Sequence, residues 1–480
     1  MYLTSLLCLI FLQTTAAPGD DVNRLVGALL GPTSTIANLQ QLSDEIGGRL
    51  TGSQANLDSV DWALERFRER GVSARKEAFT MPRRWLPDHV EAVVRVGKKG
   101  FSPRMVSMGF SVSGHFKAPL LDGGTGSEAD FARLGTSARE AFILVVTPPL
   151  QNIDDLFAEY AAAVSTEGRA IAAGAKGLVY MSSRPKNLLN RHVAWLGDKN
   201  KAPMLVMERE AAKRAQRLLH GGHDLELDVT IVLEDSGSYT SYNVIGEIPG
   251  SAFPEQVVIF GAHLDSWDLG TGALDNGCNV AMLIEIAAQI QKLGLKPKRT
   301  LRFALWNGEE QGLMGSAAYT QRYKADMDNH ILATSIDIGS GRITGFFTGG
   351  RPEILPAVAR SLEPVAGLGP FVQVDVPIVG TDNYDFMIQG IANLVANQES
   401  ANYGPNYHAR SDTFDKVDQQ QLRLNSAIVA AVMWYFSGAE IDWKRQDRTQ
   451  VEALINATDL KEQMISMGVW DTWLDGTRAR

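Results

Sequence analysis

The chain has 480 residues, of which 45% are hydrophobic and 21% are charged, and its formal net charge at pH 7 is −9. A chain of this length exceeds what one hydrophobic core usually supports, so we expect two domains. The negative net charge, with no basic run along the chain, argues against a nucleic-acid surface, and we expect no nucleic-acid partner.

The first residues are typical of a secretory signal. Residues 6–12 form an apolar run, and the small residues at 14–17 offer a cleavage site, so we predict a signal peptide over residues 1–17 and a secreted or extracytoplasmic protein. This run and the apolar stretch at 427–436 are both too short to span a membrane, so we expect no membrane partner. After cleavage Cys278 would remain alone, which excludes an intrachain disulfide and favours a buried, inert thiol.

Hydrophobic spacing then predicts two helices between residues 33 and 80, the second over residues 54–70 and ended by Gly71. We assign residues 18–113 to the first part of a catalytic domain. From 114 to 235 the pattern changes to short apolar runs around one helix at about 155–173, which indicates a compact inserted domain. The apolar runs lie at 141–146, 176–180, 203–207 and 225–233.

From residue 236 to about 440, strands alternate with helices. Apolar runs at 257–260, 301–306 and 332–336 predict strands, and helical spacing follows each of them. This alternation is typical of an α/β fold, here a three-layer α/β/α domain with a mixed, largely parallel sheet. The last segment, 441–480, reads as a helical tail.

Chemistry-bearing residues follow these predicted strands. His263, Asp265 and Asp275 lie on the loop after the first strand, and Glu309 and Glu310 lie after the second. Imidazole and carboxylate groups at the end of buried strands are how an α/β protein holds a hydrolytic metal. Adjacent side chains point in different directions, so one glutamate can bind a metal while its neighbour acts as a base.

Asp337 follows the third strand, and Tyr407 and His408 lie on a later loop rich in turn residues. Taken alone, Asp337 reads as a turn former and His408 as a solvated loop residue. Together with the preceding residues they complete a set of two imidazoles and three carboxylates, too many for one tetrahedral zinc. Such a set suits two zinc ions bridged by a carboxylate, and Asp265 is placed to accept the second N–H of His263.

In this order the residues resemble the co-catalytic di-zinc exopeptidases, the aminopeptidase and glutamate carboxypeptidase family. The resemblance covers nearly all of the mature chain and is nearest to the glutamate carboxypeptidase branch. The motifs that carry it are GRLTGS at 48–53, YNVIGEIPG at 242–250, GAHLDSWD at 261–268, KPKRTLR at 296–302, EEQG at 309–312, GTD at 380–382, and His408 with Asp412 and Thr413.

The resemblance implies a role for each site residue. His263 and Asp337 would hold one zinc ion, Glu310 and His408 the other, with Asp275 as the bridge. A water between the ions would attack the peptide, and Glu309 would be the general base. The insert would be a protease-associated, or lid, domain. Tyr407 matches a tyrosine that stabilises the oxyanion in some relatives, although simple packing is the alternative, and the family also suggests a homodimer.

Two residues depart from the family pattern. Asn276 replaces the usual aspartate after Asp275, at a peptide bond that is cis in the family, and Cys278 replaces a residue that is usually small. We therefore expect a cis bond between Asp275 and Asn276, and these two replacements next to the bridging carboxylate are where metal affinity or sensitivity to oxidation would differ.

The sequence thus predicts a secreted di-zinc exopeptidase acting on dipeptides or short peptides. The alternatives are an aminopeptidase of the same family, a metal-free binding homologue, and a one-zinc glutaminyl cyclase. The intact ligand set disfavours the second, and the insert disfavours the third. Arg410, Arg351 and Lys186 are the cations that could bind a peptide's C-terminal carboxylate, but their positions do not decide between the two chain ends.

Overall fold

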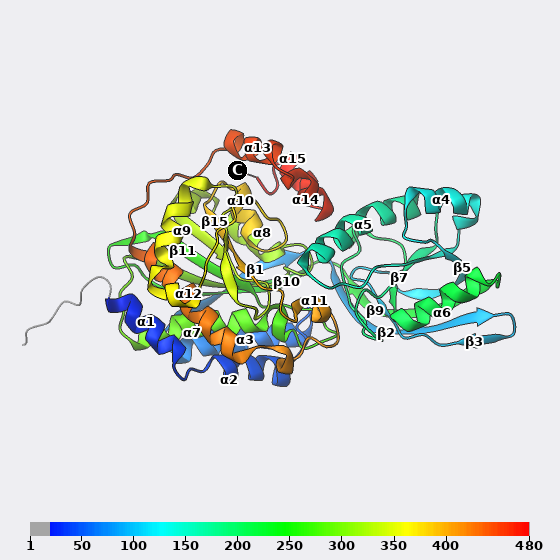
Figure 1. The fold of residues 1–480 in the computed structure, drawn as a ribbon, viewed down its shortest axis with the longest axis horizontal. Helices are drawn as coiled ribbons and strands as arrows, with labels where there is room; N and C mark the ends of the chain where they lie inside the picture. The colour runs from blue at the N-terminus through cyan, green and yellow to red at the C-terminus, as the bar shows by residue number, and fades with distance from the viewer. Residues whose placement is uncertain (1–19, 480) are drawn as a thin grey trace, which may run out of the picture.

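The computed structural model describes residues 20–479, so the predicted signal peptide and Cys8 lie outside the described part of the chain. Two β-sheets form two bodies that lie side by side (Figure 1). The first body carries the expected three-layer arrangement, and the second is built almost entirely from residues 84–236, which we call the second domain.

The first sheet has seven strands in the order β1-β10-β12-β11-β13-β15-β14. Its four central neighbours β12, β11, β13 and β15 run parallel, and β1, β10 and β14 pair antiparallel at the two sides, so the sheet is mixed, as predicted. The strands are β1 (Ser73–Met81), β10 (Tyr239–Ile248), β11 (Phe253–His263), β12 (Arg299–Trp306), β13 (His330–Ser335), β14 (Ile343–Phe347) and β15 (Asn393–Gln398).

Helices cover both faces of this sheet. Val258 and Phe260 of β11 pack with the helices of one face, while Val257 and Ile259 pack with those of the other, because successive strand residues point to opposite sides. One face carries α1 (Asp20–Leu30), α2 (Thr35–Gln40), α3 (Gln54–Glu69), α7 (Cys278–Lys292), α9 (Leu355–Ser361) and α12 (Gln419–Gly438), and the other carries α8 (Met314–Arg322) and α10 (Asn383–Ile388). Burial on both faces explains the nearly continuous apolar runs of the central strands.

The second sheet has eight strands in the order β3-β2-β9-β5-β6-β7-β8-β4. Three of them precede residue 114, where we expected the insert to begin, so the domain starts at about residue 84. The strands are β2 (Arg84–Val96), β3 (Lys99–Phe101), β4 (Met105–Ser107), β5 (Gly114–Asp122), β6 (Phe142–Val145), β7 (Gly177–Met181), β8 (Met204–Met207) and β9 (Leu225–Ser236), with helices α4 (Glu128–Leu134), α5 (Ile153–Ala172) and α6 (Arg209–His220). The second domain begins at β2 because β2 pairs antiparallel with β9 along most of its length, although the two strands lie far apart in the sequence.

The C-terminal segment forms three helices, as the helical tail predicted: α13 (Arg448–Ala457), α14 (Leu460–Ser466) and α15 (Trp470–Leu474). Their apolar side chains pack with Leu313, Tyr384 and Ile388 of the first domain. In Figure 1 this segment lies above α8 and α10, and α14 approaches α5 of the second domain. The segment therefore contacts both domains.

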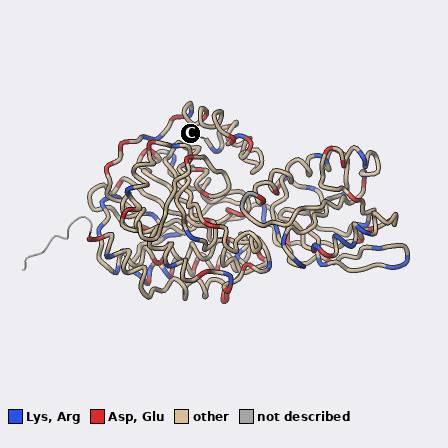
Figure 2. The backbone as a smooth tube through the Cα atoms, in the orientation of Figure 1, with Lys and Arg blue, Asp and Glu red and all other residues tan. Residues whose placement is uncertain are grey.

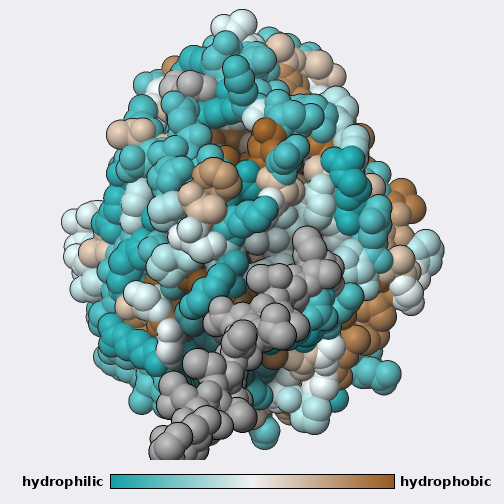
Figure 3. All heavy atoms as spheres, turned by 90° about the vertical axis from the view of Figure 1, so that its left-hand side faces the viewer, coloured by the Kyte–Doolittle hydropathy of each residue, from teal (hydrophilic) through white to brown (hydrophobic). Residues whose placement is uncertain are grey.

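The surface mixes charges of both signs. Acidic and basic residues are interspersed along the backbone of both domains (Figure 2). On the face of the first domain turned away from the second, the described hydrophobic side chains lie in separate patches among hydrophilic ones (Figure 3). Among residues 20–479, no helix combines the length and the apolar character that crossing a bilayer requires.

One buried carboxyl in the second domain makes stability depend on pH. Glu167 on α5 is fully buried, and one of its oxygens accepts a hydrogen bond from the backbone N–H of Trp195. Burial raises the pKa of Glu167 to about 7 from 4.5. The folded state therefore binds more protons than the unfolded state between these values, so this residue's contribution to stability falls as the pH rises from 4.5 to 7.

We predict that Glu167→Gln stabilises the protein by roughly 3 kcal/mol above pH 7, with a gain that shrinks toward pH 5, because the amide cannot ionise. Thermal unfolding of both proteins between pH 5 and pH 8 measures the difference. Glu91→Gln, at an exposed position on β2, is the control and should show no such trend. A gain independent of pH would contradict the prediction.

Candidate metal centre

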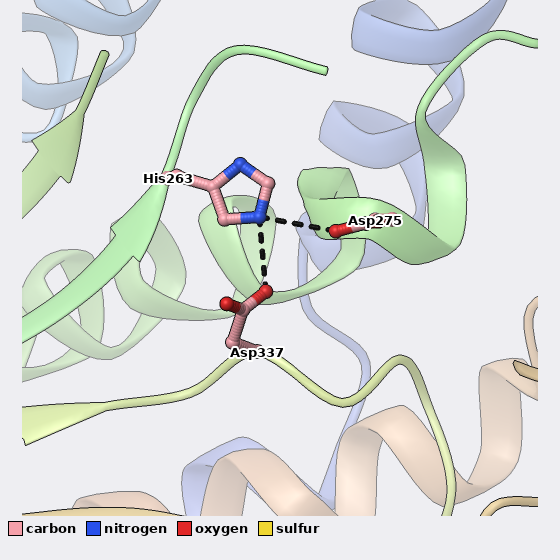
Figure 4. A group of neighbouring side chains, drawn as sticks. All are labelled: His263, Asp275 and Asp337. Atoms are coloured by element: carbon pink, nitrogen blue, oxygen red, sulfur yellow. Dashed lines mark hydrogen bonds and ion pairs between the residues drawn. The ribbon is translucent and has the colours of Figure 1, made fainter. Parts of the chain in front are cut away.

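The first group of candidate ligands comes from two neighbouring parallel strands. His263 is the last residue of β11, and Asp337 follows β13 by two residues, at the same level because Gly261 pairs with Ser335. Nε2 of His263 lies 2.9 Å from Oδ1 of Asp337 and 3.0 Å from Oδ1 of Asp275, which precedes α7 (Figure 4). The three side chains point at one another, as metal ligands must.

The second group shares Asp275 with the first. Nε2 of His408 lies 2.8 Å from Oε2 of Glu310 and 3.2 Å from Oδ2 of Asp275. Within each group the possible ligand atoms all lie within 4.8 Å of one another. The structure thus brings together all five residues that the sequence analysis selected as ligands, and one oxygen of Asp275 faces each histidine.

The donors of both groups fit a cation. Oε1 of Glu310 is buried and has no hydrogen-bond partner among residues 20–479, an arrangement that costs free energy unless a positive charge satisfies it. Burial raises the pKa of Glu310 well above its usual value, and the nearby charge of Asp275 adds to the effect. Imidazole nitrogens and carboxylate oxygens at these positions are the ligands that zinc prefers.

The two imidazoles differ in charge: burial lowers the pKa of His408, whereas His263 is surrounded by carboxylates. Burial acts to lower the pKa of His263, but the carboxylates of Asp337 and Glu309 outweigh it and raise that pKa well above the usual value. Burial also opposes ionisation of Asp275, yet hydrogen bonding with His263 and His408 lowers its pKa. The centre therefore holds concentrated negative charge.

Glu309 belongs to neither ligand group. It lies beside Glu310 on the loop after β12 and is only half-buried, whereas Glu310 is buried. Burial raises the pKa of Glu309 well above its usual value; the positive charge of His263 opposes the rise, and the charges of Asp337 and Glu310 add to it. A carboxyl with a raised pKa next to a ligand cluster is suited to accept and release a proton.

Asp265 contacts His263 through its backbone oxygen rather than its carboxylate. Nδ1 of His263 lies 3.0 Å from the backbone oxygen of Asp265 but 3.7 Å from its carboxylate, so the carbonyl is the acceptor for the ring. The carboxylate accepts instead from the hydroxyl of Thr51, at 2.6 Å. The expectation that Asp265 accepts the second N–H of His263 named no oxygen, and in the structure the backbone oxygen lies at hydrogen-bond distance.

Tyr407 is turned toward the second domain. Its ring stacks on His408, with 3.7 Å between ring centres, and its hydroxyl lies 3.0 Å from the hydroxyl of Tyr160 on α5. This arrangement gives Tyr407 a packing role. Stabilisation of an oxyanion by Tyr407 stays a prediction.

The two unusual residues beside Asp275 are both buried. The Asp275–Asn276 peptide bond is cis, as expected, and Nδ2 of Asn276 donates to the carbonyl of Ile336 at 2.8 Å. Cys278 is completely buried, and burial raises the pKa of its thiol well above the usual value. Both observations agree with an inert, packed Cys278.

None of the three cations proposed for a carboxylate lies free in the centre. Arg410 and Lys186 are exposed, and Arg351 donates to the carbonyls of Gly390 and Lys444. Their positions leave the choice between a C-terminal and an N-terminal exopeptidase open.

Two residues that hold the ligand loop were not assigned a role from the sequence. Arg49 is fully buried, and its guanidinium donates to the carbonyls of Gly47, Leu264, Thr271 and Gly272 at 2.7–2.9 Å. Asp412 accepts from the backbone N–H groups of Leu274 and Asp275 at 2.6 and 3.1 Å. Burial raises the pKa of Asp412 to about 7. Both residues lie in motifs that carried the family resemblance, which was the available signal.

The second domain also reaches the centre. Nδ1 of His192 lies 3.1 Å from Nδ1 of His408, and Nε2 of His192 lies 3.1 Å from Oε1 of Glu159 on α5. Burial opposes ionisation of Glu159, but the hydrogen bond with His192 and the charge of Arg184 lower its pKa to about 2. Glu159 is therefore a carboxylate. No sequence signal singled out His192.

Comparison with known proteins agrees with this geometry. Residues 243–433 match the family model described as Peptidase family M28. The chain is 28% identical to carboxypeptidase Q of Xenopus laevis over 411 residues, which are 83% of this chain and 84% of the relative. It is 33% identical to human carboxypeptidase Q over 244 residues, 50% of this chain and 51% of that protein.

Solved structures share the fold. The Peptidase M28 precursor from Shewanella amazonensis SB2B has a TM-score of 0.79 and 24% identity, covering 90% of this chain and 99% of that chain. BSAP, a zinc aminopeptidase from Bacillus subtilis, has a TM-score of 0.65 and 19% identity, covering 83% of this chain and 93% of that chain. The resemblance drawn from the motifs is thereby confirmed.

We predict that Arg49→Lys lowers the free energy of unfolding by about 3 kcal/mol, because one ammonium cannot replace a planar guanidinium that serves four carbonyls. Urea unfolding measures the loss. Arg68→Lys, at an exposed position on α3, is the matched control and should change stability by less than about 0.5 kcal/mol. An unchanged urea midpoint for Arg49→Lys would show that the four hydrogen bonds do not hold the loop.

Proposed function

We propose that the chain, a zinc-dependent exopeptidase, hydrolyses dipeptides or short peptides with two zinc ions. The premise is that residues 243–433 match the model of peptidase family M28. The observation that carries the two-ion proposal is the position of Asp275. Its Oδ1 faces His263 and its Oδ2 faces His408, so a single carboxylate belongs to both ligand groups.

In this proposal His263 and Asp337 hold one ion, Glu310 and His408 hold the other, and Asp275 contributes to both. Zinc bound in such a pair of sites lowers the pKa of water and polarises the carbonyl that is attacked. Arg49 and Asp412 hold the backbone of the loop that carries Asp275, the carboxylate shared by both groups.

Glu309 is the proposed general base. It is adjacent in the chain to the ligand Glu310, it is not engaged as a ligand, and it is partly exposed. In the reaction its carboxylate takes a proton from the attacking water and passes it to the nitrogen of the leaving amine. The backbone N–H of Glu309 lies 3.4 Å from the Asp265 carboxylate, which helps to keep the loop in place.

In the proposal the peptide enters beside the second domain, whose His192 contacts His408 at the centre. The cavity at the centre has a volume of only about 10 Å³, which is room for one water molecule. It is lined by Trp267, Asp275, Glu310 and His408, together with neighbouring loop residues. We infer that the second domain moves to admit a peptide and closes afterwards to exclude water, a common use of such domains.

Carboxypeptidase activity is the first choice for the end that is cleaved, because relatives named carboxypeptidase Q match over more than four fifths of their length. An aminopeptidase is the alternative, supported by 34% identity over 230 residues to a protein named probable lipoprotein aminopeptidase LpqL from Mycobacterium tuberculosis. A metal-free binding protein is disfavoured because both ligand groups are complete.

Two further parts of the proposal concern secretion of the protein and the formation of a homodimer. The composition of residues 1–17 supports secretion, and the family resemblance supports a homodimer. Detection of the processed protein outside the cell tests the first, and sedimentation at several concentrations tests the second.

We predict that Glu309→Gln retains zinc but loses activity by roughly 10²–10⁴-fold, because the amide keeps the shape of the side chain and removes only the proton acceptor. Elemental analysis of the metal and assays with a dipeptide measure the two effects separately. Glu255→Gln, at an exposed position on β11, is the control and should keep both properties. Loss of zinc from Glu309→Gln would mean that the ligand and base assignments are exchanged.

A panel of one dipeptide in free, N-acetylated and C-amidated forms is expected to distinguish the two chain ends. For a carboxypeptidase, amidation abolishes hydrolysis and acetylation does not, because the free carboxylate is the recognised group. Loss on acetylation alone would instead establish an aminopeptidase, and loss on both a dipeptidase. Initial rates at equal peptide concentration are the measurement.

A further inference from the structure

We propose that His192, a residue of the second domain, is a positioning residue for the ligand His408, so that docking of the second domain sets the zinc affinity of the group formed by Glu310 and His408. This inference rests on the ligand role of His408 proposed above. It assigns a task to the second domain other than covering the cleft.

The geometry holds the ring of His408 from two sides. Its Nε2 faces Glu310 at 2.8 Å and Asp275 at 3.2 Å, and its Nδ1 faces Nδ1 of His192 at 3.1 Å. The two rings have their centres 4.8 Å apart and are tilted by 56°. Among residues 20–479, His192 is the hydrogen-bond partner found for Nδ1 of His408.

The donor and acceptor capacity of each side chain assigns the protons along the series Glu159, His192 and His408. Oε1 of Glu159 lies 3.1 Å from Nε2 of His192, and a carboxylate can only accept, so Nε2 of His192 carries a hydrogen. In a neutral imidazole the other nitrogen, Nδ1, is then an acceptor. It receives the Nδ1–H of His408, which leaves Nε2 of His408 with a free electron pair directed at the ligand group.

The hydroxyl of Tyr160 is a second possible donor to His192 and also has Tyr407 within reach. The hydroxyl of Tyr160 is 3.2 Å from Nδ1 of His192 and 3.0 Å from the hydroxyl of Tyr407. In the proposed arrangement the Tyr160 hydroxyl donates to the closer Tyr407 oxygen, which leaves the electron pair of His192 to His408. The order Glu159, His192, His408 therefore selects the form of His408 that binds a metal.

The backbone of the second domain is tied to the ligand loop at the same place. The N–H of Arg191 donates to the carbonyl of His408 at 3.1 Å, and the N–H of Arg410 lies 3.3 Å from the carbonyl of Leu189. The guanidinium of Arg184 donates to the carbonyl of Tyr407 at 2.8 Å. A movement of the second domain that breaks these bonds also removes the acceptor from His408.

His263, the other proposed histidine ligand, is oriented by its own segment of the chain. Nδ1 of His263 is oriented by a carbonyl two residues further along the same chain segment, that of Asp265. His408 has its orienting partner on a different domain, and that partner is held by a carboxylate on α5. Removal of such an orienting group typically costs 10–100-fold in metal affinity.

The test compares zinc binding by the metal-free full-length protein and its variants, measured by titration against a competing chelator. We expect two ions per wild-type chain. His192→Phe, which keeps a ring but has no acceptor, should bind one ion with unchanged affinity and the other 10–100-fold more weakly. His192→Asn, whose Oδ1 can take the place of Nδ1, should restore most of that affinity.

The controls separate this inference from the proposed function and from damage to the fold. His223→Phe, an exposed histidine of the same domain, should bind zinc like the wild type. Fewer than two ions on the wild-type chain would refute the two-zinc proposal itself. If the wild type binds two, then equal affinities in His192→Phe, equal weakening of both ions, or failure of His192→Asn to restore binding would overturn the role of His192.

Folding is checked by the thermal midpoint of each metal-free variant. A midpoint within a few degrees of the wild type, together with the selective loss of one ion, supports the positioning role. His192→Ala serves as a second variant without an acceptor. Failure of both His192→Phe and His192→Ala to fold would show that His192 serves the fold rather than the ligand, and would overturn the inference as well.

Discussion

The structure depends on keeping several carboxylates together, out of water, at one edge of a sheet. Parallel pairing of β11 with β12 and β13 brings the ends of these strands to the same place, and each end carries acidic residues. Buried carboxylates repel one another and lose hydration, so they persist only with positive charge among them. The proposed zinc ions would supply that charge, and Arg49 holds the surrounding loop through its carbonyls.

The parts of this arrangement that depend on local pattern could be predicted from the sequence. Apolar runs identified β11, β12 and β13, and the ends of these strands with the segments that follow them carry His263, Asp275, Glu309, Glu310 and Asp337. His408 lies on a later loop, and only its combination with these residues singled it out. The marginal strand β1, with its sequence SARKEAFTM, is too polar to stand out as a strand. Its place is decided by pairing with β10, which lies far away in the chain.

The residues that sequence reasoning missed act through long-range contacts. Arg49 binds carbonyls more than two hundred residues ahead of it, and His192 meets His408 from another domain. The start of the second domain was misjudged for the same reason, since β2 is recognised by its pairing with β9 rather than by its own composition. Residue types around a strand end indicate chemistry, whereas the groups that orient those residues emerge only when the chain is folded.

The second domain is inserted into the first domain at one position of the chain, between two neighbouring strands. The chain leaves the first sheet at Met81 and returns at Tyr239, and these two residues face each other across β1 and β10. Topologically the whole domain is therefore a very long loop of a β-hairpin, the kind of site where insertions are tolerated. A gene could gain, lose or exchange such a domain without disturbing the register of the catalytic sheet. A relative that lost the second domain would, however, need another hydrogen-bond acceptor for Nδ1 of His408, because the proposed acceptor, His192, belongs to that domain.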